Sequence, residues 1–137
     1  MLSELALVLA VASMAAMGKP SQLLCALADF AEADGYNDVP VCDVGPSTEN
    51  YGDFNWSVFV CRGPNPKLMF ASTFETPDVA FFLVEVVDET VEVEKVGGWA
   101  NATFEKARTE LLALTPSKVE AIAIRLSGFS RLEPGCD

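Results

Sequence analysis

Four short apolar segments separated by tight links occupy the middle of the chain. The link GPNP after the first segment holds a glycine and two prolines, which cannot continue a strand ladder. In the last segment valines alternate with Glu92 and Glu94, as in a strand with one exposed face. Links this short join antiparallel neighbours, so the pattern predicts a four-stranded antiparallel meander sheet. Its strands are residues 54–62 (FNWSVFVCR), 67–75 (KLMFASTFE), 79–87 (VAFFLVEVV) and 90–96 (TVEVEKV).

Apolar residues recur at helical spacing on both sides of these strands. The first such stretch predicts a helix over residues 20–34, ended by Gly35 as a C-cap. A second predicted helix covers residues 101–114, and the threonine-proline pair that follows predicts the start of another. Residues 117–127 also alternate like a strand, but we favour a helix. We therefore expect an α+β fold in which the sheet packs against N-terminal and C-terminal helices.

Residues 37–53 (NDVPVCDVGPSTENYGD) are rich in turn formers and acids. Glycine, proline, asparagine and aspartate at this density favour turns over strands. We interpret this stretch as a long surface loop that leads into the sheet. The overlapping sequence ADGYND, residues 33–38, brings acidic oxygens together but lacks the framework of an EF-hand calcium loop, so we predict no metal site here.

Residues 1–19 form an apolar stretch that ends at Lys19, and we treat residues 20–137 as a single α+β domain. The stretch has an apolar core of signal-peptide length followed by small residues, although Glu4 weakens the positive start of a signal. It is shorter than the roughly 20 apolar residues that a membrane-spanning helix needs. Three alternatives stay open: an export signal, a core helix, and an anchor or polymerisation helix. Export, to the periplasm or outside the cell, is narrowly favoured over a cytoplasmic location, and membrane contact is expected only through residues 1–18.

The sequence has 20 acidic and 9 basic residues, which gives a formal net charge of −11. Such a surface repels phosphate groups, so we expect no binding to nucleic acid. There is no histidine, which removes the commonest general base and the commonest metal ligand. We predict a protein that is not an enzyme, with no catalytic residue, no cofactor and no metal. A hydrolase that works with carboxylates alone is kept as the least favoured alternative.

The four cysteines, Cys25, Cys42, Cys61 and Cys136, include no C-x-x-C spacing, which argues against a zinc knuckle or a thioredoxin-type motif. Their even number fits two disulfides in an oxidising compartment or four reduced thiols in a reducing one. Two disulfides among four cysteines allow three pairings. We predict that Cys42 pairs with Cys61, because both flank the loop expected to enter the sheet.

Candidate partner-binding residues lie in and around the last predicted strands. Five acids gather at the final turn, where they fit a basic partner; the alternative is a charged edge that discourages aggregation between sheets. Consecutive phenylalanines on a strand point to opposite faces, so one of them is exposed unless both faces are covered. We expect a protein partner or self-association at this surface. The candidate residues are Glu85, Asp88, Glu89, Glu92, Glu94, Phe81, Phe82 and Trp56.

The order of features from Leu23 to Leu114 resembles the YbjN-like family, whose fold is similar to that of type III secretion chaperones. The similar parts are a helix ending in EADGY, the strands FNWSVFVC and KLMFASTFE, and the closing stretch VEVEKVGGWANATFEKARTELLAL. The chain departs from that family because it lacks a clear helix between the second and third predicted strands. The resemblance implies a non-enzymatic binding domain with a chaperone-like or regulatory role.

A second resemblance is to type IV pilins and pseudopilins. It rests on the apolar N-terminal stretch with Glu4 near its start, on Pro20, on the four-stranded meander and on the C-terminal Cys136. The glutamate is the fourth rather than the fifth residue, and Lys19 interrupts the apolar stretch early. This resemblance implies a structural subunit that assembles through its N-terminal helix.

Overall fold

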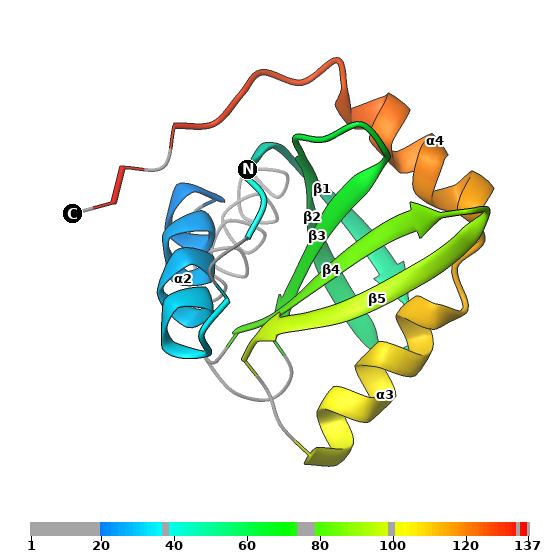
Figure 1. The fold of residues 1–137 in the computed structure, drawn as a ribbon, viewed down its shortest axis with the longest axis horizontal. Coiled ribbons are helices and arrows are strands. Elements are labelled where there is room, and N and C mark those ends of the chain that lie inside the picture. The colour runs from blue at the N-terminus through cyan, green and yellow to red at the C-terminus, as the bar shows by residue number, and fades with distance from the viewer. Residues whose placement is uncertain (1–19, 37–38, 74–78, 99–100, 134, 137) are drawn as a thin grey trace, which may run out of the picture.

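A five-stranded antiparallel sheet forms the centre of the computed structural model, which describes residues 20–36, 39–73, 79–98, 101–133 and 135–136. Helix α2 (Pro20–Ala33) covers one face of the sheet, and α3 (Asn101–Leu112) and α4 (Pro116–Leu126) cover the other (Figure 1). The α+β class and the antiparallel meander are confirmed, whereas the predicted number of four strands is wrong. In chain order and in spatial order the strands are β1 (Cys42–Tyr51), β2 (Phe54–Cys61), β3 (Lys67–Thr73), β4 (Val79–Val87) and β5 (Thr90–Gly97).

The additional strand is β1, which occupies most of the stretch interpreted from the sequence as a surface loop. Its 10 residues lie opposite 8 residues of β2, and the register shifts next to Asp43 and again around Gly45 and Pro46. Such shifts are β-bulges, which accommodate an extra residue and are common at sheet edges. Gly45 has φ +145°, and a Cβ here would lie 2.6 Å from the carbonyl oxygen of Val58. The turn-forming residues therefore mark bulges within an edge strand, and the loop interpretation is wrong.

The face of the sheet toward α3 and α4 carries a closed aromatic core. Trp56, Phe70 and Phe82 are buried there, and the Trp56 ring meets the other two edge to face at centroid distances of 5.8 and 5.7 Å. Phe104 of α3 stacks on Phe82 at 5.2 Å. Aromatic pairs in these arrangements stabilise beyond the area they bury. The helices and the link between them close this core with Ala107, Leu111, Leu114, Val119, Ile122 and Leu126.

Helix α2 lays one apolar stripe on the opposite face of the sheet. Its end is a Schellman motif, as the predicted C-cap requires: Gly35 has φ +80° and its N–H donates to the Glu32 carbonyl oxygen at 3.2 Å. The N–H of Tyr36 donates to the Ala31 carbonyl oxygen at 2.7 Å. This turn holds Tyr36 at the end of α2, close to the sheet. The buried stripe consists of Leu23, Leu24, Leu27 and Ala31.

Helix α4 covers all but the last of residues 117–127, so the helix favoured from the sequence is confirmed. Thr115 is the N-cap of α4, and its side-chain oxygen accepts a hydrogen bond from the N–H of Lys118 at 3.2 Å. Val119, Ile122 and Leu126 are buried on one side of α4. Burial at a spacing of three and four residues fits a helix and not an alternating strand.

The export-signal, core-helix and anchor alternatives all concern residues 1–19, which lie outside the described residues. Among the helices that are described, none is long and apolar enough to cross a membrane.

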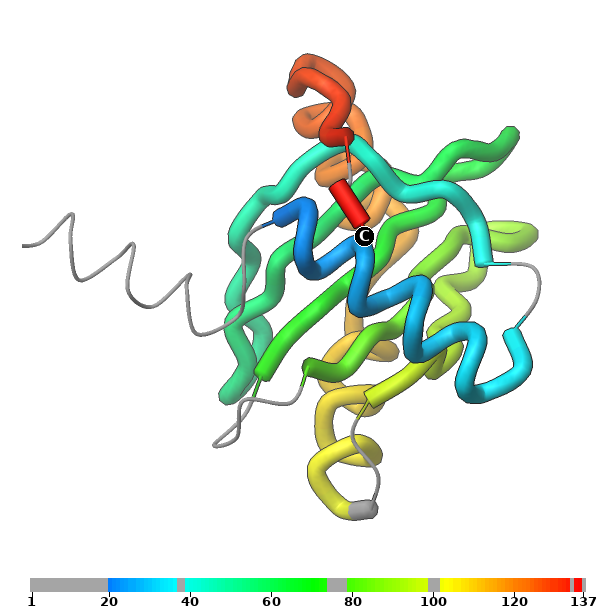
Figure 2. Tube along the Cα trace, turned by 90° about the vertical axis from the view of Figure 1, so that its left-hand side faces the viewer, coloured from blue at the N-terminus to red at the C-terminus, as the bar shows by residue number. Residues whose placement is uncertain are grey.

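The chain ends in an extended segment, which we call the C-terminal strap (residues 128–133 and 135–136). It leaves α4 on one side of the sheet, passes the outer edge of β1 and reaches α2 on the other side (Figure 2). Arg131 forms an isolated antiparallel bridge with Val44 of β1, and Cys136 is bonded to Cys25 of α2. The strap therefore links the two helical layers around one edge of the sheet.

Candidate protein-binding surface

The register of β4 and β5 places three of the five candidate acids on the face of the sheet that α2 covers. Glu85 lies opposite Glu92, and Glu94 lies opposite Leu83, whose side chain belongs to the core beneath α2. Like charges directly opposite one another on a sheet repel. Lys67 of β3, which is the other neighbour of Glu85, pairs with it at 3.4 Å and offsets part of this repulsion.

The other two candidate acids, Asp88 and Glu89, form the turn between β4 and β5. Their φ values of 49° and 64° are those of a two-residue turn with left-handed backbone, which matches the twist of a hairpin. Both side chains are exposed at the tip of the hairpin. They carry the same charge as Glu92 and Glu94 but occupy the turn and not the face that α2 covers.

Glu92 and Glu94 keep their negative charge uncompensated on this face. Lys95 is the next residue in the chain, but it points to the opposite face, where its Nζ lies 5.0 Å from the centre of the Phe104 ring. Within the described part of the chain no basic side chain forms an ion pair with Glu92 or Glu94, and both are exposed. Two free carboxylates two residues apart on one strand attract a basic partner.

An apolar groove adjoins these carboxylates. A hollow of about 380 Å³ lies between α2 and the segment that leads into β1, and a second of about 360 Å³ lies between the same segment and β4–β5. Tyr36, Val39 and Pro40 line both hollows, so the two adjoin. Glu32 lines the first hollow and Glu94 lines the second. We call this surface the acidic groove.

The groove exposes large apolar side chains next to its acids. Tyr36 is 37% exposed and Val41 is 57% exposed. The Schellman motif of α2 fixes the position of Tyr36, and the chain returns past it at Val39 before β1 begins. An exposed apolar surface rimmed by charge is typical of a site where another protein binds.

A third hollow, of about 460 Å³, lies where the turn between β1 and β2 meets α3 and α4. It is lined by Tyr51, Glu110 and Lys118, among others, so charges of both signs border it. The Tyr51 hydroxyl is buried without a hydrogen-bond partner among the described residues, and burial raises the pKa of this phenol. A charged partner therefore meets both attractive and repulsive charges at this hollow.

The three aromatic candidates for partner binding are all buried. Phe81 and Phe82 have no exposed surface and Trp56 is 1% exposed. The two phenylalanines do point to opposite faces, but helices cover both faces of the sheet. Phe81 lies under α2, with its ring centroid 5.8 Å from that of Phe30. Because both faces are covered, neither phenylalanine is exposed, and these three residues stabilise the fold.

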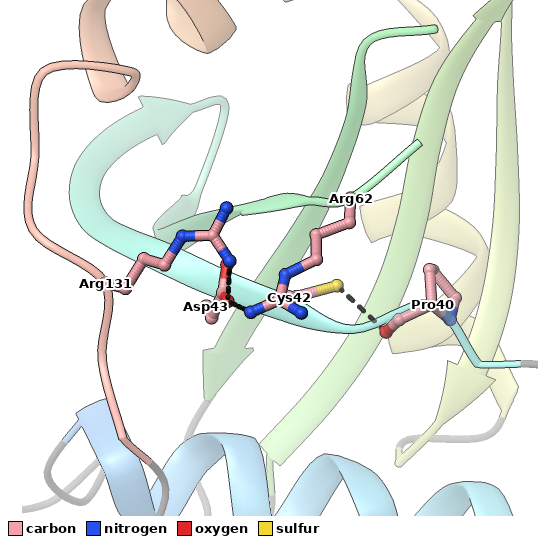
Figure 3. Close-up of polar contacts among 5 residues, drawn as sticks. All are labelled: Pro40, Cys42, Asp43, Arg62 and Arg131. Atoms are coloured by element: carbon pink, nitrogen blue, oxygen red, sulfur yellow. Dashed lines mark hydrogen bonds and ion pairs between the residues drawn. The ribbon is translucent and has the colours of Figure 1, made fainter. Parts of the chain in front are cut away.

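Both disulfides lie on the side of the sheet that α2 covers. The predicted Cys42–Cys61 disulfide is confirmed, and its cysteines face each other on β1 and β2. The second disulfide joins Cys25 to Cys136 across a sequence separation of 111 residues. In Figure 3 a dashed line marks the 3.4 Å contact between the Sγ of Cys42 and the carbonyl oxygen of Pro40. Because this sulfur belongs to the disulfide, it has no proton to donate.

Groups suited to metal binding do not gather in the part of the chain that is described. No three histidine, cysteine, aspartate or glutamate side chains converge there in a way that could hold a metal ion. Ser72 is buried, and its hydroxyl donates to the carbonyl oxygen of Asn55, which is a structural role.

No family model, curated protein or solved structure matches the chain. The resemblances to the YbjN-like family and to pilins therefore stay predictions.

Sequence reasoning found the acids of this surface but missed its apolar part. Val39 and Val41 fall in the stretch interpreted from the sequence as a loop. The spacing of Val39 and Val41 is that of a strand, which was the available signal. Two buried acids on β1, Asp43 and Glu49, were also assigned to the loop.

Proposed function

We propose that this protein is a non-enzymatic protein-binding domain, and that the acidic groove receives a polypeptide segment carrying both basic and apolar side chains. The observation that carries the proposal is a pair of exposed carboxylates that form no ion pair with the described residues: Glu94 lines the apolar groove, and Glu92 lies two residues before it on the same face of β5. A chaperone-like or regulatory role is the finer part of the same proposal.

Charge and shape each contribute a different part of the recognition. Carboxylates at the rim speed the encounter with a basic partner and fix its orientation. The apolar floor between Tyr36, Val39 and Leu83 supplies affinity, because burying apolar surface contributes about 25 cal/mol per Å² before the costs of association. A segment with basic and aliphatic residues in alternation matches both features. An acidic segment is repelled by the net charge of −11.

We further propose that the protein works in an oxidising compartment outside the cytoplasm. Two disulfides support this, because such bonds persist in exported proteins and are rare where thiols are kept reduced. The alternatives of a pilin-like subunit and a carboxylate-only hydrolase have no comparable observation among the described residues in their favour.

The test is the binding of two labelled seven-residue peptides to the oxidised protein, followed by fluorescence anisotropy. One peptide alternates lysine with leucine, and the other alternates glutamate with leucine. We expect the lysine peptide to bind, with an affinity that falls as salt rises, and the glutamate peptide not to bind.

A matched pair of double variants separates the groove from net charge alone. Glu92→Gln with Glu94→Gln removes two charges at the groove, and Asp88→Asn with Glu89→Gln removes two charges at the hairpin tip. We expect the first to weaken binding at least tenfold and the second less than threefold. Equal losses in both would mean that the lysine peptide responds only to overall charge, and the proposal would be rejected.

A further inference from the structure

The outer edge of β1 carries a buried carboxylate whose partners come from outside the strand. Asp43 is the extra residue of the first bulge, and its side chain is 7% exposed. The guanidinium of Arg62 binds it from the end of β2, and Arg131 of the C-terminal strap binds it at 3.3 Å (Figure 3). Bulges often turn a side chain to a new direction, and here the carboxylate points to the segment that passes the edge.

The strap binds this edge as an added strand would. Arg131 bridges Val44 in antiparallel orientation, and the N–H of Leu132 donates to the carbonyl oxygen of Asp43 at 2.6 Å. The Leu132 side chain packs against the core beneath α2. Two consecutive residues of the strap thus hold it at the edge, through an arginine side chain, one backbone hydrogen bond and one aliphatic side chain.

Among the described residues, few contacts besides the disulfide hold the strap in place. Phe129, Ser130, Arg131 and Glu133 are exposed, and only Leu132 is partly buried. Arg131 shares the buried Asp43 carboxylate with Arg62, and each ordered residue of the strap loses conformational entropy. The Cys25–Cys136 disulfide supplies the tether that these contacts need.

We propose that the outer edge of β1 at Asp43 is a strand-addition site for an extended polypeptide segment in which an arginine precedes an aliphatic residue. The strap fills this site within the same molecule, and the Cys25–Cys136 disulfide decides whether a partner can replace it. This site lies on β1, at the opposite edge of the sheet from β5 and its acids, so it goes beyond the function proposed for the acidic groove.

Opening the site requires a dithiol reductant. The reductant donates two electrons and two protons to the Cys25–Cys136 disulfide and is itself oxidised to a disulfide, which leaves two thiols on the protein. The strap is then covalently attached only at its α4 end, and a partner segment can compete with it for binding to Asp43. A longer partner gains further backbone hydrogen bonds along β1, which strand addition at a sheet edge provides.

The probe is a fluorescein-labelled, capped peptide GFSRLE, which copies residues 128–133. It is titrated into three full-length proteins: the oxidised wild type, Cys25→Ser/Cys136→Ser, and that double variant with Arg131→Ser and Leu132→Ser added. The added changes weaken the strap as a competitor while leaving the edge of β1 intact. We expect affinity to rise at least tenfold from the first protein to the third, with the second between them.

Matched controls test the chemistry of the site. Exchanging arginine and leucine in the probe, to GFSLRE, keeps its composition and is expected to abolish binding. Asp43→Asn in the third protein should weaken binding of GFSRLE at least fivefold, whereas Asp53→Asn, at an exposed acid that pairs with Lys106, should change it less than twofold.

The outcomes decide the proposal in either direction. Equal binding of GFSRLE to all three proteins, or equal binding of the two probes, would overturn it. Circular dichroism establishes that each variant is folded. If the third protein does not fold, the second one decides: binding at least threefold tighter than to the wild type supports the site, and no gain rejects it.

Discussion

The two faces of the sheet are built differently, although the same strands supply both. Toward α3 and α4, four aromatic side chains are almost fully buried in one cluster, and two helices close over them. Toward α2, the described residues place one helix on the sheet, with one hollow beside it and a second between the following segment and β4–β5. Both disulfides and three of the candidate acids also lie on this side. The first face has the features of a core, and the second has those of a core that is left partly open.

This difference separates stability from binding within one small domain. Edge-to-face and stacked aromatic rings around Phe82 hold the closed face without covalent links. The open face has fewer large side chains in its core and is tied instead by disulfides, which constrain the unfolded chain. Because packing on the face toward α3 and α4 supplies more of the stability, the face toward α2 can leave part of its surface exposed to a partner.

The largest expected effect comes from truncating neighbouring phenylalanines on the two faces. We expect Phe82→Ala to lower the free energy of unfolding by about 3–5 kcal/mol, because it opens a cavity among rings that cannot close over it. Phe81→Ala should cost about 1 kcal/mol less, because α2 is the one described helix over Phe81 and can shift into the space. Urea denaturation of both variants measures the difference, and a larger loss for Phe81→Ala would reverse our assignment of the two faces.

Removing the disulfide of the C-terminal strap should have a smaller effect. We expect Cys25→Ser/Cys136→Ser to lower the free energy of unfolding by about 2 kcal/mol, at the low end of the usual range for a disulfide. The reason is that the strap makes few contacts, so the folded protein also gains freedom when the tether is lost. Thermal denaturation followed by circular dichroism provides the measurement. A loss as large as that of Phe82→Ala would mean that the strap is part of the core beneath α2.

The pH dependence of the free energy of unfolding tests the closed face through one group, the hydroxyl of Tyr51. Burial raises the pKa of Tyr51, so the protonated phenol is favoured in the folded state. The folded protein therefore loses stability as pH rises from about 10 through the higher folded pKa, because the unfolded chain ionises first. We expect Tyr51→Phe to raise stability at pH 7 by about 0.5–1 kcal/mol, because a buried hydroxyl without a partner is removed. The advantage of the variant should grow above pH 10, and an advantage that shrinks there would contradict the assignment.

The smallest expected effect on stability belongs to the acids of the open face. Glu92→Gln/Glu94→Gln should change the free energy of unfolding by less than about 0.5 kcal/mol, since both side chains are exposed. The direction should be a gain, because Glu92 faces Glu85 across the strand pair. Differential scanning calorimetry compares this variant with Asp88→Asn/Glu89→Gln as its charge-matched control. A clear loss of stability would show that these acids serve the fold and not a partner.

Much of the fold followed from apolar periodicity and from local chain chemistry. The structure confirms the local signals for strands β2 to β5, for the helix ended by Gly35 and for the helix begun at Thr115. The Cys42–Cys61 disulfide also followed from proximity to the sheet entrance.

The strand β1 had no such signal. Gly45 and Pro46 interrupt its apolar pattern, and pairing with β2 through two bulges depends on the partner strand and not on local propensity.

Only part of the candidate site was predictable, because tertiary packing decides the rest. Sequence alternation assigns Glu92 and Glu94 to one face of β5, but which helix covers that face is decided by tertiary packing. The groove exists because Tyr36, which follows α2, and Val39, in the segment that leads into β1, both lie beside β4 and β5. The disulfide between Cys25 and Cys136 closes the longest loop in the chain and likewise has no local sequence signal.

The most direct test of the open face as a binding surface is an NMR titration of the isotope-labelled, oxidised protein with the alternating lysine–leucine peptide. We expect amide shifts to concentrate on the acidic groove, at Tyr36, Val39, Leu83, Glu94 and Val96, with residues of the closed core such as Ile122 unchanged. Shifts centred on α3 and α4, or spread evenly over all exposed acids, would contradict the assignment of binding to the face that α2 leaves partly open.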